Sequence, residues 1–287
     1  MAEQSIGDRV LFIGGDLKYG SVQKRCREVA EAIGAAWTAP QTGSAWPTGE
    51  VPSADLVGRN IFVLVKASVD RRELQKRGHI IWDVIDRAPP REHIDAYLTS
   101  TPLASRLLGP YVPTYTIPHH HCNVSGVFAC TNRMRGRILW IGSPEWQPDD
   151  LTQHNVELHT VGGATTDNAE LYRRADLLLN ARRFIPESAS AYLLHTVLNS
   201  GMKAINAIGF GVPSVTEWEP WIDDIASGCT VACAPGKALV AARQLLQDSA
   251  QYNRIRENCI NVAEQYSLRT IGRRYLSVLS EFAAQLD

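Results

Sequence analysis

The stretch from Ser200 to Pro213 carries the strongest chemical signal in the sequence. Ser200 is a suitable N-cap residue, and the backbone N–H groups of Gly201, Met202 and Lys203 would then open the helix toward an anion. Lys203 adds a full positive charge in the first turn, where the helix dipole also favours negative ligands. The stretch therefore indicates an anion site, although an ordinary helix-to-strand connection has the same residues.

Glycine-rich turns follow two apolar runs that are typical of strands. The first turn contains Gly14, Gly15 and Gly20, and the second is Gly142–Ser143. The first turn is not a P-loop, because Ser21 stands where a lysine is required, and it lacks the GxGxxG spacing of a dinucleotide site. Each turn can bring backbone N–H groups close to an anion or polar ligand, or can be a tight turn that needs glycine.

Short apolar runs alternate with helical patterns along the chain. We expect strands at 9–13, 61–65, 79–83, 96–99, 115–118, 137–142, 156–161, 176–180 and 213–215. We expect helices from 21 onward and at 70–77, 102–108, 168–174, 201–209, 238–246, 249–265 and 268–286. Such strands form parallel sheets covered by helices on both faces, so the fold class is α/β. Because the strand–glycine–helix pattern starts twice, we expect two Rossmann-like domains facing each other across a cleft, with a boundary near residues 123–132.

The composition excludes several classes of protein. A formal net charge of −1 provides no field that would attract nucleic acid or an anionic membrane. The N-terminus shows no apolar signal-peptide region, and no run approaches the roughly 20 apolar residues of a membrane helix. The six cysteines form no CxxC pair, which predicts reduced core thiols in a cytoplasmic protein. We expect no nucleic-acid partner and no membrane span, while a peripheral association with a membrane stays open.

The segment from Met202 to Pro213 resembles the donor-binding segment of GT-B glycosyltransferases. It has the lysine, the helix, the small residues and the closing Gly-x-Pro in that order. The likeness continues through residues 217–219 and 225–229, which are similar to the acid and the glycine turn that follow in the family, and through 265–267. In the first half, residues 95–100 and 116–120 look like the end of an acceptor domain. The resemblance covers most of the chain and is stronger in its second half.

This resemblance implies an enzyme of the bacterial surface-polysaccharide type, which moves a sugar from a nucleotide-activated donor to a glycan or other small acceptor. The implied parts are an acceptor-side domain at 1–125, a donor-binding domain at 126–270 and a terminal helix at 271–287 that can cross back. The implied reaction needs no metal ion and no cofactor beyond the nucleotide sugar.

On the donor side, the resemblance places the diphosphate at the second glycine turn and at the helix start, the nucleobase at the backbone around Gly162 and the ribose at Glu219. The implied donor-binding residues are Gly142, Ser143, Gly162, Arg182, Ser200, Gly201, Met202, Lys203 and Glu219. Lys203 and Arg182 would offset the charge that develops on the departing diphosphate. Gly14, Gly15 and Gly20 would form the acceptor-side loop.

A general base is expected in the first half of the chain. The candidates are Asp16 in the first loop, Asp83 and Asp86 at the end of one strand, and His119 at the end of another. Asp86 and His119 are favoured, and each has a plain alternative as a hinge or loop hydrogen-bonding residue. The run His119–Cys122 does not predict a zinc site, because adjacent residues of an extended strand point to opposite faces.

Two departures from the family pattern leave the anomeric outcome open. The Glu-x7-Glu pair of retaining members is missing, since the same spacing from Glu187 leads to His195. Ser21 stands where some inverting members have a histidine. A nucleotide-sugar epimerase of related fold and a catalytically silent, nucleotide-binding subunit are therefore the alternative functions.

Overall fold

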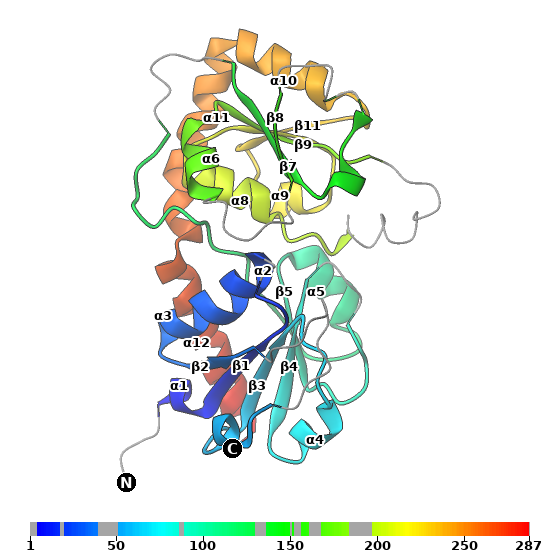
Figure 1. The fold of residues 1–287 in the computed structure, drawn as a ribbon, viewed down its shortest axis with the longest axis vertical. Helices are drawn as coiled ribbons and strands as arrows, with labels where there is room; N and C mark the ends of the chain where they lie inside the picture. Colours follow the sequence, from blue (N-terminus) through cyan, green and yellow to red (C-terminus); the bar gives the residue numbers. More distant parts are fainter. Residues whose placement is uncertain are drawn as a thin grey trace. The chain divides into compact units, whose positions relative to one another are not determined.

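The computed structural model describes residues 5–17, 20–39, 51–85, 89–129, 136–149, 151, 156–160, 168–183 and 197–286. The chain forms two compact units (Figure 1). The first unit combines Met1–His119 with Leu268–Asp287, and the second unit is His120–Ser267. The last segment of the chain therefore belongs to the first unit.

The first unit is built on a six-stranded sheet in which every pairing is parallel. Its strands, in the spatial order β2-β1-β3-β4-β5-β6, are β1 (Val10–Gly14), β2 (Ala36–Thr38), β3 (Ile61–Val65), β4 (His79–Val84), β5 (Ala96–Thr99) and β6 (Thr114–Thr116). Its helices are α1 (Ile6–Arg9), α2 (Gly20–Val22), η1 (Gln23–Glu28), α3 (Val29–Ile33), η2 (Ser53–Leu56), α4 (Arg71–Gln75), α5 (Pro102–Leu108) and α12 (Leu268–Ala284).

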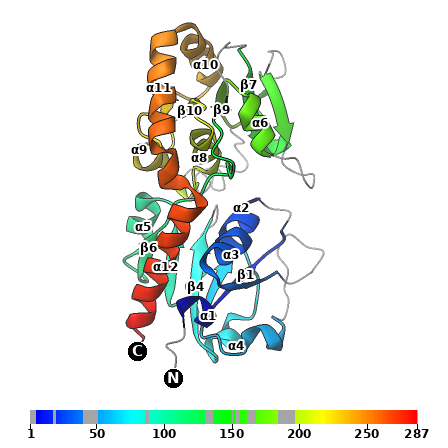
Figure 2. The same cartoon turned by 90° about the vertical axis from the view of Figure 1, so that its left-hand side faces the viewer.

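The two faces of this sheet have separate cores, because successive strand residues point in opposite directions. Val10 and Phe12 of β1 pack in the core that includes α3 and α12. Leu11 and Ile13 belong to the opposite core, which includes Leu74 of α4. Figure 2 shows α3 and α12 side by side along one face of the sheet. The terminal helix is therefore part of the core of the first unit.

The first helical segment runs through α2, η1 and α3, which confirms the helix that the sequence predicts from Ser21. Its central part, Gln23–Glu28, is a π-helical stretch. This stretch buries the side chain of Arg25, of which only 1% is exposed. The segment ends at Gly34, whose φ of 70° is the left-handed conformation that glycine adopts without strain.

The second unit has a five-stranded sheet, again with parallel pairings throughout. In the spatial order β11-β10-β9-β7-β8, its strands are β7 (Ile138–Gly142), β8 (Val156–Thr160), β9 (Leu177–Asn180), β10 (Ser214–Glu217) and β11 (Thr230–Cys233). Its helices are η3 (Pro144–Trp146), α6 (Asn168–Arg174), α8 (Met202–Gly209), α9 (Trp221–Ile225), α10 (Ala238–Gln247), α11 (Ser249–Val262) and η6 (Ala263–Tyr266).

Helices cover both faces of this second sheet. Trp140 and Leu179 point into a core formed with α8, α9, α10 and α11. Leu139 and Leu178, the neighbours of those residues, point into the core that contains Tyr172 of α6. Figure 2 shows α10 and α11 on one side of the sheet and α6 on the other. The α/β class and the two parallel sheets predicted from the sequence are thus confirmed.

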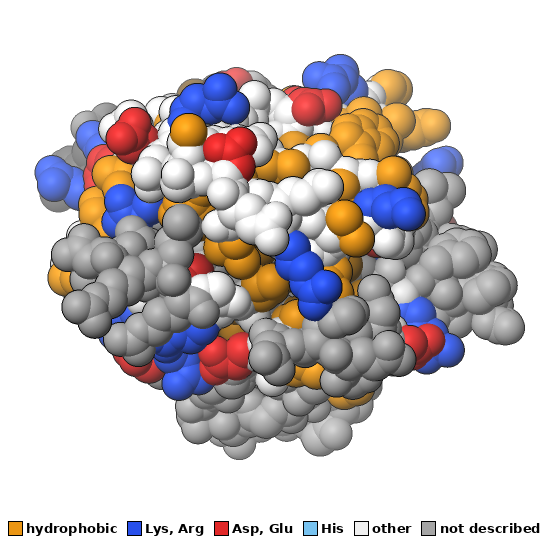
Figure 3. All heavy atoms as spheres, turned by 90° about the horizontal axis from the view of Figure 1, so that it is seen from above, with side chains coloured by type: hydrophobic (Ala, Val, Ile, Leu, Met, Phe, Trp, Pro, Cys, Tyr) orange, Lys and Arg blue, Asp and Glu red, His pale blue; other side chains and the backbone are white. Residues whose placement is uncertain are grey.

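On the face drawn in Figure 3, Lys and Arg side chains are interspersed with Asp and Glu side chains, which agrees with the formal net charge of −1. In the part of the chain that the structure describes, no helix is both long enough and apolar enough to cross a membrane.

Candidate functional site

The carboxyl edge of the second sheet gathers most residues that the sequence assigns to donor binding. β10, β9 and β7 are neighbours in the sheet and run in the same direction, so they end at one edge. The last residues of β7, β9 and β10 are Gly142, Asn180 and Glu217. The segments that follow these ends carry Ser143, Arg182 and Glu219, and α8 begins with Met202.

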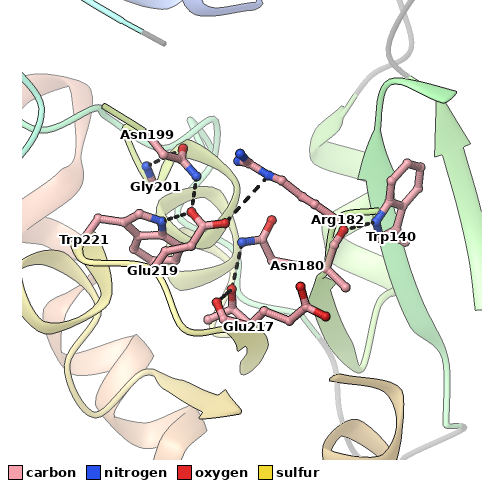
Figure 4. Close-up of polar contacts among 10 residues, drawn as sticks. Trp140, Asn180, Arg182, Asn199, Gly201, Glu217, Glu219 and Trp221 are labelled. Atoms are coloured by element: carbon pink, nitrogen blue, oxygen red, sulfur yellow. Dashed lines mark hydrogen bonds and ion pairs between the residues drawn. The ribbon is translucent and has the colours of Figure 1, made fainter. Parts of the chain in front are cut away.

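The carboxylate of Glu219 is the centre of a buried group of polar contacts at this edge (Figure 4). Its Oε2 accepts hydrogen bonds from Nδ2 of Asn199 and from Nε1 of Trp221. Its Oε1 lies 3.7 Å from Nε of Arg182. Only 7% of the Glu219 side chain is exposed, and a carboxylate that is this buried needs such donors to offset the loss of water.

The predicted N-cap of α8, Ser200, is wrong. Gly201 occupies the N-cap position with a φ of 62°, and the N–H of Gly201 donates to Oδ1 of Asn199 at 3.2 Å. A Cβ atom on Gly201 would lie 3.0 Å from the ring of Trp221. Ser200 is buried, and the N–H of Gly201 is already used within the protein. An anion site here would therefore depend on Met202 and the residues after it.

A cation of α8 lies close to a tryptophan ring at this edge. Nζ of Lys203 is 5.9 Å from the centre of the Trp140 ring, and Nε1 of Trp140 donates to the carbonyl oxygen of Ala181 at 2.9 Å. Arg182 is the next residue after Ala181, and 15% of its side chain is exposed. Arg182 after β9 and Lys203 in the first turn of α8, which the sequence assigns to the diphosphate, therefore both lie at the carboxyl edge of this sheet.

The second glycine turn has a packing role in addition to its assigned one. A Cβ atom on Gly142 would lie 2.6 Å from the ring of Trp140, so glycine at this position allows the ring to pack over the end of β7. Ser143 follows, and its carbonyl oxygen accepts from the N–H of Trp146 at 3.0 Å in η3. Gly162, the residue assigned to the nucleobase, lies outside the described residues.

The first glycine turn brings two backbone segments of the first unit close together. The N–H of Gly15 donates to the carbonyl oxygen of Val65 at 2.9 Å, and a Cβ on Gly15 would lie 2.3 Å from the carbonyl oxygen of Lys66. Lys66 itself has a φ of 51°, a backbone conformation that residues other than glycine rarely adopt. A strained residue at the carboxyl end of a parallel strand indicates a functional position, and Lys66 was not predicted from the sequence.

The other candidate residues of the first unit differ in packing and in burial. A Cβ on Gly14 would lie 2.8 Å from Cγ1 of Val22, so this glycine also serves close packing, whereas Gly20 has open space around it. Asp16 is half-buried just beyond β1. His119 is fully buried, and Asp86 lies outside the described residues.

Asp83, at the carboxyl end of β4, forms a buried polar group of its own. Its Oδ2 lies 2.6 Å from Nε of Arg25 and accepts from the hydroxyl of Tyr275 at 3.3 Å. Arg25 also donates to the carbonyl oxygen of Ile117 at 2.8 Å. Burial raises the pKa of Asp83, and Arg25 opposes that shift. Burial raises the pKa of Tyr275 well above its usual value, so the hydroxyl keeps the proton that it donates.

Two side chains that organise the donor-side edge, Asn199 and Trp221, were not among the residues predicted from the sequence. Asparagine two positions before a glycine at a helix start can accept from that backbone N–H, and this spacing was the available signal for Asn199. Trp221 gave no comparable signal, because its contact with Glu219 depends on the way the chain enters α9.

Among the described residues, no group of three or more His, Cys, Asp and Glu side chains is placed to hold a metal ion. Cys26, Cys229, Cys233 and Cys259 are free thiols.

Two units, each with a parallel sheet covered by helices on both faces, define the fold class of the GT-B glycosyltransferases. The GT-B resemblance seen in the sequence is thus confirmed at the level of the fold. No protein-family model matches the sequence, and no curated protein matches it.

Solved structures with this fold cover nearly the whole chain. HepE of Anabaena in complex with UDP and glucose matches with a TM-score of 0.64 and 10% identity, over 95% of this chain and 99% of that one. AviGT4, a glycosyltransferase involved in avilamycin A biosynthesis, matches with a TM-score of 0.60 and 13% identity, over 96% and 98%. Sucrose-phosphate synthase of Thermosynechococcus elongatus matches with a TM-score of 0.60 and 11% identity, over 96% and 100%.

Proposed function

We propose that this protein is a glycosyltransferase that moves a sugar from a nucleotide-activated donor to a glycan or other small acceptor, without a metal ion, in the cytoplasm. The observation that carries the proposal is the carboxyl edge of the second sheet, where Arg182 lies against Glu219 and Lys203 of α8 lies over the ring of Trp140, in a chain with the GT-B fold. HepE, a structure of the same fold, has been solved with UDP and with UDP-glucose, which makes UDP the first donor nucleotide to test.

The proposed chemistry follows from the charge at this edge. When the bond between the sugar and the diphosphate breaks, negative charge accumulates on the departing diphosphate. Cations and backbone N–H groups that are already in position stabilise that charge more than they stabilise the intact donor. Lys203, Arg182 and the first turn of α8 would provide these groups, together with Gly142 and Ser143, while the backbone near Gly162 would hold the nucleobase.

The acceptor hydroxyl needs a base, which we propose comes from the first unit. The candidates stay Asp16, Asp86 and His119. Substitution of the true base by Asn or Gln lowers the rate of transfer by about 10²- to 10⁴-fold and leaves UDP affinity nearly unchanged. A variant that loses rate and UDP affinity together would not identify a base.

The first test is a thermal-shift titration with UDP and UDP-sugars. Binding at 100 times the dissociation constant stabilises the folded state by about 2.7 kcal/mol. We expect Lys203→Ala to lose most of that stabilisation. Lys76→Ala is the matched control, because Lys76 is an exposed lysine of the first unit that pairs with Glu73 on α4. If UDP stabilises neither the wild type nor the control, the donor assignment is wrong.

The second test separates a transferase from the alternatives. Release of UDP from a UDP-sugar, measured with and without EDTA, is expected to proceed at the same rate in both conditions. Interconversion of two nucleotide sugars without UDP release would instead identify an epimerase. Binding of UDP without any turnover of the UDP-sugars and acceptors tried would favour the silent nucleotide-binding subunit.

A further inference from the structure

The carboxylate of Glu219 already has protein partners on both oxygens. Oε2 accepts from Asn199 and Trp221, and a carboxylate oxygen has two lone pairs to offer. Oε1 lies 3.7 Å from Nε of Arg182. With 7% of its side chain exposed, Glu219 is held inside the unit rather than presented at its surface. This arrangement differs from that of a residue that reaches out to a ribose.

Through Asn199, the carboxylate controls the backbone that begins α8. Asn199 is fixed at both ends of its amide, since Nδ2 donates to Glu219 and Oδ1 accepts from the N–H of Gly201. Trp221, the second donor to Glu219, lies against Gly201, where a Cβ atom would be 3.0 Å from its ring. The left-handed turn at Gly201 is therefore held on two sides by residues that Glu219 anchors.

The same carboxylate also fixes a cation. Arg182 has its Nε toward Oε1 of Glu219, and the structure gives its guanidinium no hydrogen bond to any described residue. A guanidinium has five N–H donors in a rigid fork, so an anchor at Nε orients the terminal nitrogens without using them. In Figure 4 the guanidinium extends from the end of β9 toward Glu219, above Asn180.

We propose that Glu219 is a positioning residue for the diphosphate site and not a ligand of the ribose. It sets the orientation of the Arg182 guanidinium and, through Asn199 and Trp221, the direction of the first turn of α8. Groups that are fixed before the ligand arrives bind with a smaller loss of conformational entropy, so Glu219 strengthens diphosphate binding without touching the diphosphate. The inference rests on the proposed function, because it takes a nucleoside diphosphate as the ligand.

The test compares UDP, 2′-deoxy-UDP and inorganic pyrophosphate by calorimetry on the wild type, Glu219→Ala, Glu219→Gln and Arg182→Ala. We expect Glu219→Ala to weaken all three ligands by the same factor, about tenfold or more. Gln retains an oxygen for Asn199 and Trp221, so Glu219→Gln recovers the part of the affinity that depends on the start of α8. The loss that remains in Glu219→Gln belongs to Arg182, and it disappears when the substitution is made in the Arg182→Ala background.

A role at the ribose predicts a different pattern. In that case Glu219→Ala and Glu219→Gln weaken UDP but leave pyrophosphate unchanged, and both abolish a preference of the wild type for UDP over 2′-deoxy-UDP. That outcome overturns the inference and leaves the proposed function intact. If the wild type binds none of the three ligands, the proposed function fails and the inference falls with it. Should Glu219→Ala fail to fold, the cycle of Glu219→Gln with Arg182→Ala decides between the two roles.

Discussion

Arg25 and Asp83 form an ion pair inside the first unit, with Nε 2.6 Å from Oδ2 and with 1% and 0% of the two side chains exposed. The pair joins the π-helical stretch after β1 to the carboxyl end of β4, and Tyr275 of α12 completes it. Asp83 lies where a general base was considered, but its partners make it a structural anchor. The position of an acid at a strand end therefore does not by itself identify a base.

Arg25→Met is expected to destabilise the first unit strongly. It leaves the carboxylate of Asp83 buried without its cation, which costs about 3–5 kcal/mol in comparable cases. The measurement is urea-induced unfolding. Glu73→Gln is the control, because Glu73 and Lys76 pair with 60% and 63% of their side chains exposed, and exposed pairs contribute about 0–1 kcal/mol. The double variant Arg25→Met with Asp83→Leu should recover much of the loss, and a double variant no better than the single one would contradict this account.

Gly15→Ala and Gly20→Ala are expected to have different effects on the stability of the first unit, because only Gly15 is packed against the backbone of another strand end. A Cβ on Gly15 meets the carbonyl oxygen of Lys66 at 2.3 Å, so the backbone must shift, and overpacking of this kind costs about 1–3 kcal/mol. Gly20 has no atom within 4 Å of the added methyl and starts a helix, so its replacement should be neutral or stabilising by up to about 1 kcal/mol. Thermal unfolding of the two variants measures the difference, and equal melting temperatures would speak against the close approach.

Gly201→Ala is expected to lower the free energy of unfolding more than Gly58→Ala, although both glycines have a similar backbone conformation. Gly201 and Gly58 have φ values of 62° and 74°. Alanine in this left-handed region is less stable than glycine by about 1–2 kcal/mol at either position. Only Gly201 also faces the ring of Trp221, since nothing lies within 4 Å of a Cβ on Gly58. Unfolding in urea should show the larger loss for Gly201→Ala, and calorimetry should show weakened UDP binding for this variant alone. Equal effects of the two substitutions on UDP binding would remove Gly201 from the donor site.

The Cys233 thiol is expected to react slowly with iodoacetamide at neutral pH. Burial raises the pKa of Cys233 to about 11, and the charge of Glu217 adds to that shift. Only the thiolate is the nucleophile, so at about pH 8 roughly one thiol in a thousand is reactive. The alkylation rate, followed by peptide mass spectrometry, should rise about tenfold per pH unit from about pH 7.5 to 9.5. A rate that levels off near pH 9 would show an unshifted thiol. Glu217→Gln should increase the rate, whereas Cys259 in the same sample, which is fully buried, should stay unmodified.

Most strands were predictable because each is a continuous apolar run between polar segments. Ile61–Val65 is an example, since β3 lies inside a parallel sheet and all five of its residues are buried. β2 (Ala36–Thr38) and β11 (Thr230–Cys233) were missed. Both are short strands at the edges of their sheets with mostly half-buried residues, so their sequences lack the apolar signal of a central strand. α9 was missed as well, because five residues are too few to show a helical period.

The candidate site was predictable to the extent that strand ends determine it. Arg182 and Glu219 come together because β9 and β10 are parallel neighbours. A sequence pattern of buried strands predicts a parallel sheet with the strand ends at one edge, whereas the order of the strands comes from the structure. The contact between Asn199 and Glu219 was not predictable, because it depends on the left-handed turn at Gly201. The role of Glu219 changes for the same reason, since a sequence shows the acid but not the donors that surround it.

The order in which the chain is made has a consequence for the first unit. A ribosome joins residues 120–267, the whole of the second unit, before it adds any residue of α12. Until then, the face of the first sheet that holds Val10 and Phe12 lacks Ile271 and Leu279, and the pair of Arg25 and Asp83 lacks Tyr275. All residues of the second unit are therefore present in the chain before the first unit has those of its last helix, although most of the first unit comes earlier in the sequence.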